Sequence, residues 1–154
     1  MKKTFLIVCY YLLSSHAMIV KPSHHNLPDS AILKDIFESE IGTIYFYGNI
    51  AIVEAKEGVT LSYKNAFPVL VKGLTYLKVS SWVYISNRIN SYSLIPQDYK
   101  YLEKVPTLKG IAVVAKSNIG VKNTEVEAAF FNKPFVSFSN LTEAYNWGKD
   151  LLDS

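Results

Sequence analysis

Cysteine and histidine are scarce in this sequence. Its 154 residues include one cysteine, Cys9, and three histidines, all of which precede residue 26. Cysteine and serine nucleophiles usually need a histidine partner, and a disulfide needs two cysteines. From residue 26 onward the chain therefore cannot build these catalytic groups, a disulfide or a histidine-ligated metal site. We expect no catalytic residue, no metal and no cofactor, and hence a protein that is not an enzyme.

An excess of basic charge is also missing outside the first residues. The formal net charge is +3, and Lys2, Lys3 and Lys21 account for all of it. Nucleic acids and anionic membranes attract clusters of Lys and Arg. Neither is therefore expected as a partner. The sequence also has no G-x-G-x-x-G motif and no P-loop after a predicted strand, which excludes the usual phosphate cradles.

The longest apolar stretch lies near the amino terminus, at residues 5–13, and it is too short to span a bilayer. It follows two lysines, as in a secretory signal peptide. The alternative is that translation starts at Met18. We expect no transmembrane segment, and we place the protein in the cytoplasm unless residues 1–17 direct export.

The segment KPSHHNLPDS follows and is typical of a linker. His24 and His25 are adjacent, so they cannot share a helix face as a pair of metal ligands. We expect them to lie in a solvated tail. The predicted organisation is a leader and linker over residues 1–28 and one α/β domain over residues 29–154.

Apolar residues make up 49% of the chain and charged residues 19%, which is typical of a protein with a packed core. Their spacing predicts extended segments at 35–41 and 43–47, a turn at Gly48 and Asn49, and strands at 50–55, 82–86, 110–115 and 134–138. Helices are predicted between these strands, around 67–77, from Pro96 to about residue 106, and after a capping box at Thr124 and Glu127. A last helix, capped by Asn140, follows the final strand. Either Asn65 caps the first helix or Pro68 kinks it. The order β-β-α-β-α-β-α-β-α predicts an α/β fold: a mixed, mostly parallel sheet with an N-terminal antiparallel hairpin and packed helices.

A polar stretch follows the predicted strand at 82–86. Ligands of such sheets bind beyond the carboxyl ends of the strands. The candidate residues for binding a partner or ligand are therefore Ser86, Asn87, Arg88, Asn90, Ser91, Tyr92, Ser93 and Tyr99. Ser91 is also a candidate for phosphorylation, because a phosphate here would lie near the positive end of the following helix.

Arg88 is the sole arginine of the chain. A guanidinium can bind a carboxylate or phosphate through two parallel hydrogen bonds. The alternative is that Arg88 fastens the loop by pairing with Asp98 or Glu103. Other carboxylates, including those of Glu54 and Glu127, are assigned to strand ends, helix starts and solvated faces.

Four stretches carry a resemblance to a known family: EIGTIYFYGNIAIVEAKEGV, VYISNRINSYSLIPQDYKYLEK, LKGIAVVAKS and FFNKPFVSFSNLTEAYNW. With them, residues 35–152 resemble small bacterial proteins of the STAS superfamily (sulfate transporter and anti-sigma factor antagonist), especially those described as STAS or CRAL-TRIO-like. The resemblance implies a STAS-like domain that binds a partner or ligand without turnover. Antagonists of this family carry an Asp-Ser-[Ser/Thr]-Gly signature that is phosphorylated. Here NRINSYS stands at that place without the acidic residue or the glycine, so the phosphorylation switch is not implied, although Ser91 is nearest in position.

The function predicted from these features is that of a non-enzymatic regulatory or interaction domain, which binds a protein partner through the loop at residues 86–93. The alternative is a carrier of a lipid or another small ligand, of CRAL-TRIO-like type, which needs an apolar cavity behind the helices. A third hypothesis is an enzyme that uses Tyr, Ser, Lys or carboxylate groups in place of His and Cys. Homo-oligomers are compatible with all three.

Overall fold

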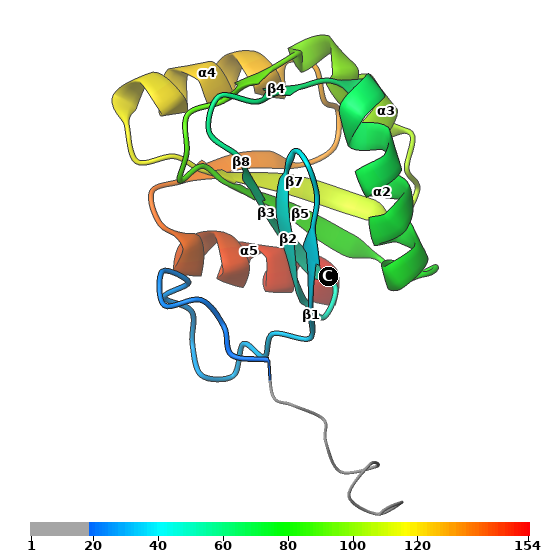
Figure 1. Ribbon diagram of the computed structural model, residues 1–154, viewed down its shortest axis with the longest axis vertical. Helices are drawn as coiled ribbons and strands as arrows, with labels where there is room; N and C mark the ends of the chain where they lie inside the picture. Colours follow the sequence, from blue (N-terminus) through cyan, green and yellow to red (C-terminus); the bar gives the residue numbers. More distant parts are fainter. Residues whose placement is uncertain (1–18) are drawn as a thin grey trace, which may run out of the picture.

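The computed structural model describes residues 19–154, so the predicted leader and Cys9 lie outside the described residues. A six-stranded sheet runs through the molecule in the order β1-β2-β3-β5-β7-β8 (Figure 1). Its strands are β1 (Asp35–Glu38), β2 (Gly42–Tyr47), β3 (Ile50–Ala55), β5 (Trp82–Asn87), β7 (Leu108–Val114) and β8 (Phe135–Phe138). The first three strands pair antiparallel and the rest pair parallel. The predicted α/β fold with an antiparallel hairpin is confirmed.

Helices cover both faces of the sheet (Figure 1). They are α2 (Tyr63–Leu77), α3 (Tyr99–Glu103), which follows a 3-10 turn (Pro96–Asp98), α4 (Asn118–Ala128) and α5 (Leu141–Asp153). Helix α5 lies on one face, and α2, α3 and α4 lie on the other. Two short strands that were not predicted, β4 (Thr60–Leu61) and β6 (Ser93–Leu94), form a small parallel sheet. No helix in residues 19–154 has the length and apolarity needed to cross a membrane.

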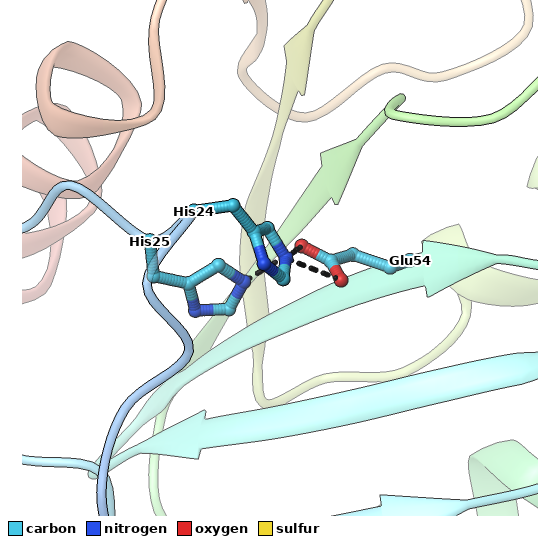
Figure 2. A group of neighbouring side chains, drawn as sticks. All are labelled: His24, His25 and Glu54. Atoms are coloured by element: carbon cyan, nitrogen blue, oxygen red, sulfur yellow. Dashed lines mark hydrogen bonds and ion pairs between the residues drawn. The ribbon is translucent and has the colours of Figure 1, made fainter.

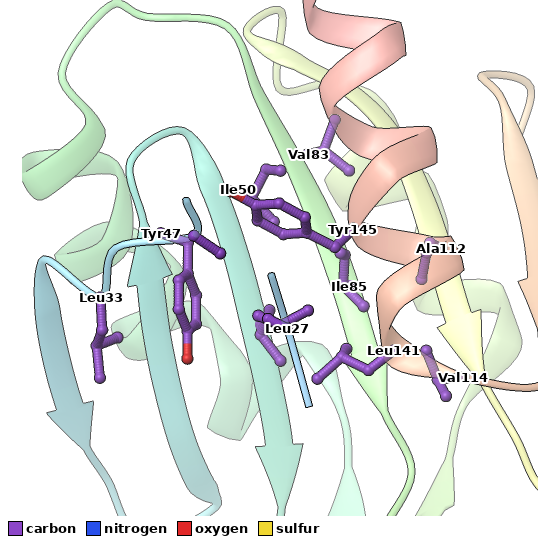
Figure 3. Close-up of a cluster of buried hydrophobic side chains, with 13 residues drawn as sticks. Leu27, Leu33, Tyr47, Ile50, Val83, Ile85, Ala112, Val114, Leu141 and Tyr145 are labelled. Atoms are coloured by element: carbon purple, nitrogen blue, oxygen red, sulfur yellow. The ribbon is translucent and has the colours of Figure 1, made fainter. Parts of the chain in front are cut away.

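The core on the α5 side includes the chain before the first strand. Strand side chains such as Ile50 and Ile85 cluster there with Leu141 and Tyr145 of α5 (Figure 3). Leu27, Ala31 and Leu33 complete the same cluster. The described part of the predicted linker therefore contributes a buried side chain to the core.

Helix α5 packs closely on the sheet, whereas α2 leaves space. A Cβ atom on Gly110 of β7 would lie 2.8 Å from Leu151 Cδ2, and one on Gly148 would lie 3.2 Å from Val83 Cγ1. In α2, a Cβ atom on Gly73 would lie 3.8 Å from its nearest neighbour, Phe46 Cζ. The glycines thus allow a close approach at α5, while α2 stands farther from the strands below it.

The predicted start of the helix after residue 110 is wrong. Helix α4 is capped by Ser117, whose Oγ accepts a hydrogen bond from Gly120 N at 3.1 Å. Thr124, predicted as the cap, lies inside this helix and donates its hydroxyl to Gly120 O at 2.8 Å. This is the alternative hydrogen bond that threonine makes within helices. The prediction that Asn140 caps α5 is confirmed, since its Oδ1 accepts from Glu143 N at 2.9 Å.

Helix α2 begins before the predicted cap. Its first residue is Tyr63, and Asn65 lies within the first turn. Asn65 Oδ1 accepts a hydrogen bond from the backbone N–H of Ser62 at 2.9 Å. Pro68 lies inside the helix. Asn65 therefore supports the helix start from within the first turn, and the helix begins at Tyr63 rather than after Asn65.

Candidate functional site

The loop predicted as the binding site starts inside the protein. Ser86 and Asn87 are the last two residues of β5, and both are buried. Consecutive strand residues point to opposite faces, so Ser86 lies on the α2 side and Asn87 on the α5 side. Ser86 Oγ shares a hydrogen bond with the hydroxyl of Tyr92 at 2.7 Å, and Asn87 Nδ2 donates to Glu54 Oε1 at 2.8 Å. Both polar side chains are thus paired within the chain.

Arg88 forms an internal ion pair, but its partner is not the one considered from the sequence. Its Nη2 donates to Oε2 of Glu127 in α4, and the Tyr99 hydroxyl donates to the same oxygen at 2.7 Å. Asp98 and Glu103 instead accept hydrogen bonds from Tyr63 N and Asn132. The expected pairing with Asp98 or Glu103 is therefore wrong, although an ion pair does fasten the loop.

Glu127 is buried near the end of α4, so its assignment to a helix start or a solvated face is also wrong. Its burial places a negative charge beside the phenol of Tyr99. Desolvation and this charge together raise the pKa of Tyr99 well above its usual value. Burial lowers the pKa of Arg88, but the hydrogen bond to Glu127 and the Coulombic attraction of Tyr92, Glu127 and Tyr99 together outweigh burial, so the net pKa is raised. The guanidinium therefore stays charged and paired.

The rest of the loop lies along the chain that follows β3. Asn90 Nδ2 donates to Ala55 O at 2.9 Å, and Ser91 N donates to Glu57 Oε2 at 2.8 Å. The side chains of Asn90, Ser91 and Ser93 are exposed, as is Ile89. This outer part is the most exposed part of the loop, and Arg88 and Tyr92 are half-buried beside it. The assignment of the loop to partner binding, and of Ser91 to phosphorylation, stays a prediction.

A second polar cluster lies at the carboxyl end of β3, and the sequence analysis missed it. A turn at residues 22–25, closed by a hydrogen bond from His25 N to Pro22 O at 2.9 Å, brings two adjacent imidazoles to Glu54 (Figure 2). His24 Nε2 lies 2.9 and 3.0 Å from the two carboxylate oxygens, and His25 Nε2 lies 2.6 Å from Oε1. The expectation of a solvated tail is wrong for His25, whose side chain is fully buried.

The environment of Glu54 favours its charged form. Desolvation by burial raises its pKa, but hydrogen bonds from His25 and Asn87 outweigh burial, so the net pKa is lowered. The sequence did carry a signal for this residue. Along β3, Ile50, Ile52 and Glu54 point to the same face, and that face is the core. A carboxylate in an inward position requires a buried partner.

An apolar cavity of about 120 Å³ lies between α2 and the sheet. Its lining is apolar except for Ser39 and the polar edges of two aromatic rings. The lining residues are Ser39, Ile41, Gly42, Ile44, Phe46, Ala51, Val53, Ala55, Leu61, Ala66, Val69, Leu70, Gly73, Leu74, Leu77, Trp82, Tyr84 and Leu102. None of them carries a charge. The cavity is the one that the alternative hypothesis of a small-ligand carrier requires.

A second cavity of about 120 Å³ adjoins the first and lies between the start of α2 and α3. The two share five lining residues: Leu61, Ala66, Leu70, Tyr84 and Leu102. At its outer side lie the exposed rings of Tyr63 and Phe67. The apolar space under α2 thus extends from the strands to the surface. No sequence pattern predicts it, because it depends on the distance between the helix and the sheet.

No family model matches the chain, and no curated protein matches it. A similar solved structure is that of an uncharacterised protein of the DUF3478 family from Shewanella loihica PV-4, described as having a SpoIIAA-like fold. The similarity covers 74% of this chain and 90% of that chain, with 18% identity and a TM-score of 0.49. SpoIIAA-like is the fold type of STAS proteins.

Proposed function

We propose that this protein binds an apolar small molecule, such as an aromatic ring or a segment of an acyl chain, in the cavity beneath α2. The observation that carries this proposal is the uncharged lining of a cavity of about 120 Å³ next to a second of similar size. An engineered apolar cavity of about 150 Å³ stays dry and binds benzene. A space of this kind gains more from an apolar ligand than from water, because it offers water almost no hydrogen-bonding partner.

The same lining favours binding without chemical turnover. It contains no imidazole, thiol, carboxylate or amine. The indole Nε1 of Trp82 donates to Thr107 Oγ1 at 3.1 Å and is therefore already paired. Asp98 lines only the second cavity, and its Oδ2 accepts from Tyr63 N at 2.6 Å. We therefore assign the protein a carrier or sensor role for its ligand and no enzymatic one.

Helix α2 is the element that a ligand would move. It carries Gly73 and Ala66 on the side facing the cavity, and these small residues leave the space open. Its other side exposes Val71 and Thr75. Filling the cavity would add contacts between α2 and the sheet. Ligand binding would therefore stabilise α2, and this change could signal the bound state to a partner.

The first test is native mass spectrometry of the protein purified from its expression host, with analysis of an organic extract. We expect an added mass from an apolar compound, or saturable binding of the fluorescent probe ANS by a stripped sample. The variant Gly73→Leu places a side chain in the cavity and should abolish both signals. The matched control Thr75→Leu adds a leucine on the exposed side of the same helix and should leave both unchanged.

A clear result would reject this proposal. If Gly73→Leu folds normally and binds the probe as the parent protein does, the ligand is not under α2. If the parent shows neither bound compound nor saturable binding, the cavity is not a ligand site.

A second candidate function is the binding of a protein partner through the outer part of the loop after β5. It is favoured by the exposure of Ile89, 47% of whose surface is accessible, between paired polar residues. A charged variant, Ile89→Asp, should remove such a partner from a pull-down while leaving apolar ligand binding intact. Equal recovery of the same proteins with both forms would count against this function.

A further inference from the structure

We propose that His24, His25 and Glu54 form a binding site for a divalent transition-metal ion of the Zn²⁺ class. The donor atoms of the three side chains all lie within 4.8 Å of one another (Figure 2). Two imidazole nitrogens and one carboxylate are a ligand set that Zn²⁺ takes in proteins. The site lies on the α5 side of the sheet and is independent of the cavity beneath α2. It also runs against the expectation, drawn from the sequence, that the protein binds no metal.

Three nitrogen atoms converge on the Glu54 carboxylate. Oε1 has neighbours from His24 at 2.9 Å, His25 at 2.6 Å and Asn87 at 2.8 Å. His24 Nε2 also lies 3.0 Å from Oε2, so both imidazoles face the carboxylate as a set of ligands around one ion does. A metal ion replaces the two imidazole contacts with coordination bonds. Oε1 then keeps Asn87 as its hydrogen-bond donor.

The charges of the cluster point the same way. Glu54 is 6% exposed, and the ion pairs of residues 19–154 give it no lysine or arginine partner. A buried carboxylate needs a compensating charge. A divalent ion held by the two imidazoles and Glu54 supplies that charge directly.

The surroundings orient the donors as metal sites require. Metal-bound histidines usually hydrogen-bond through their second ring nitrogen. His25 does so, because its Nδ1 lies 2.8 Å from the hydroxyl of Tyr47 while its Nε2 faces Glu54. The ring of Tyr45 packs edge-on against His25 with centroids 4.6 Å apart. Tyr47 and Asn87 therefore act as positioning residues for the proposed ligands.

An ion can enter from the outer side of the cluster. The side chain of His24 is 43% exposed, whereas those of His25 and Glu54 are buried. Ligand atoms around a tetrahedral Zn²⁺ lie roughly 3.3 Å apart, given bonds of about 2.0–2.2 Å. The carboxylate–imidazole separations are 2.6–3.0 Å, and the three donor atoms all lie within 4.8 Å of one another, so the range includes the tetrahedral separation. With three protein ligands, the fourth position is left to water or another small ligand.

The test uses the full chain without a polyhistidine tag, stripped of metal by a chelator. Zn²⁺ is titrated by calorimetry in competition with a chelator of known affinity, and Co²⁺ serves as a spectroscopic probe. We expect one ion per chain and a visible Co²⁺ spectrum of low coordination number. His25→Gln and Glu54→Gln should each weaken binding by about 100-fold or more. The matched control Glu38→Gln, an exposed carboxylate on β1, should bind as the parent does.

A second variant keeps the test informative if the buried substitutions unfold the protein. His24→Gln changes a partly exposed ligand, so it should fold normally and still bind Zn²⁺ at least about tenfold more weakly. Tyr47→Phe removes the hydroxyl that orients His25 and should weaken binding by about tenfold. Binding below one ion per two chains, or equal affinity in the parent and the folded His24→Gln variant, would overturn the proposal. The proposed carrier function is tested separately, by the loss of ligand binding in the Gly73→Leu variant.

Discussion

At the scale of single residues, two buried carboxylates organise the polar groups at the carboxyl ends of the strands. On the α5 side of the sheet, the Glu54 carboxylate contacts the side chains of His24, His25 and Asn87. On the other side, the Glu127 carboxylate accepts hydrogen bonds from Arg88 and Tyr99. Each carboxylate joins segments that lie far apart in the sequence. Sequence reasoning selected three of these partners, Asn87, Arg88 and Tyr99. It missed the two acceptor carboxylates, Glu54 and Glu127, because it assigned them to strand ends, helix starts and solvated faces. The inward position of Glu54 along its strand was not considered.

Arg88 is expected to act as a structural residue. Arg88→Ala leaves Glu127 buried without its cation, and breaking such a pair costs about 3 kcal/mol of unfolding free energy. Urea unfolding followed by circular dichroism measures the loss. Arg88→Met combined with Glu127→Leu removes both charges and should recover most of the stability. Lys104→Ala, at an exposed position, is the control and should change little. Equal stability of Arg88→Ala and the parent would show that the pair is unimportant.

At the scale of elements, the sequence predicted the long helices and strands well and the short ones poorly. The strand at 110–115 and the helix after Asn140 have clear apolar periodicity, and both are present. The strands β4 and β6 have two residues each, too few for any periodicity. The start of α4 was misplaced because Thr124 and Glu127 have the spacing of a capping box, while Ser117 does the capping. Local motifs therefore located elements but not all of their ends.

Replacing glycine by alanine should change the free energy of unfolding in opposite directions on the two sides of the sheet. Gly73→Ala in α2 should raise the unfolding free energy by about 0.5–1 kcal/mol, because alanine favours a helix and its Cβ has room. Gly110→Ala in β7 should lower it by about 1–3 kcal/mol, since its Cβ would lie 2.9 Å from Pro134 O. Thermal and urea unfolding of both variants compare the layers directly. A destabilised Gly73→Ala would mean that α2 packs as tightly as α5.

At the scale of the whole molecule, the order of elements was sufficient to predict the α/β architecture. Alternating strands and helices force crossover connections, and these give parallel strands with helices on both faces. Two global features could not be predicted in this way. The first is the packing of the chain before residue 29, which depends on the burial of Leu27 in the core on the α5 side. The second is the cavity, which depends on the distance between α2 and the strands. Both are set by packing distances rather than by local pattern.

One buried and one half-buried tyrosine make the stability of the molecule sensitive to alkaline pH. Burial raises the pKa values of Tyr84 and Tyr99 above the ordinary value of 10.0. Above about pH 10 the unfolded chain loses protons that the folded protein retains, so unfolding becomes more favourable as pH rises. The stabilisation is complete below pH 10 and declines above it, by up to about 1.4 kcal/mol per pH unit for each tyrosine.

Urea unfolding between about pH 8 and pH 11 measures this decline. Tyr84→Phe has no hydroxyl to ionise, so its stability should fall less steeply above pH 10 than that of the parent. The difference between the two proteins at neutral pH serves as the reference. Parallel curves would mean that Tyr84 ionises alike in the folded and unfolded chains, and they would contradict the desolvation of its hydroxyl on the α2 side of the sheet. A shallower curve for the variant would locate part of the alkaline sensitivity beside the cavity, because Tyr84 lines both of its parts.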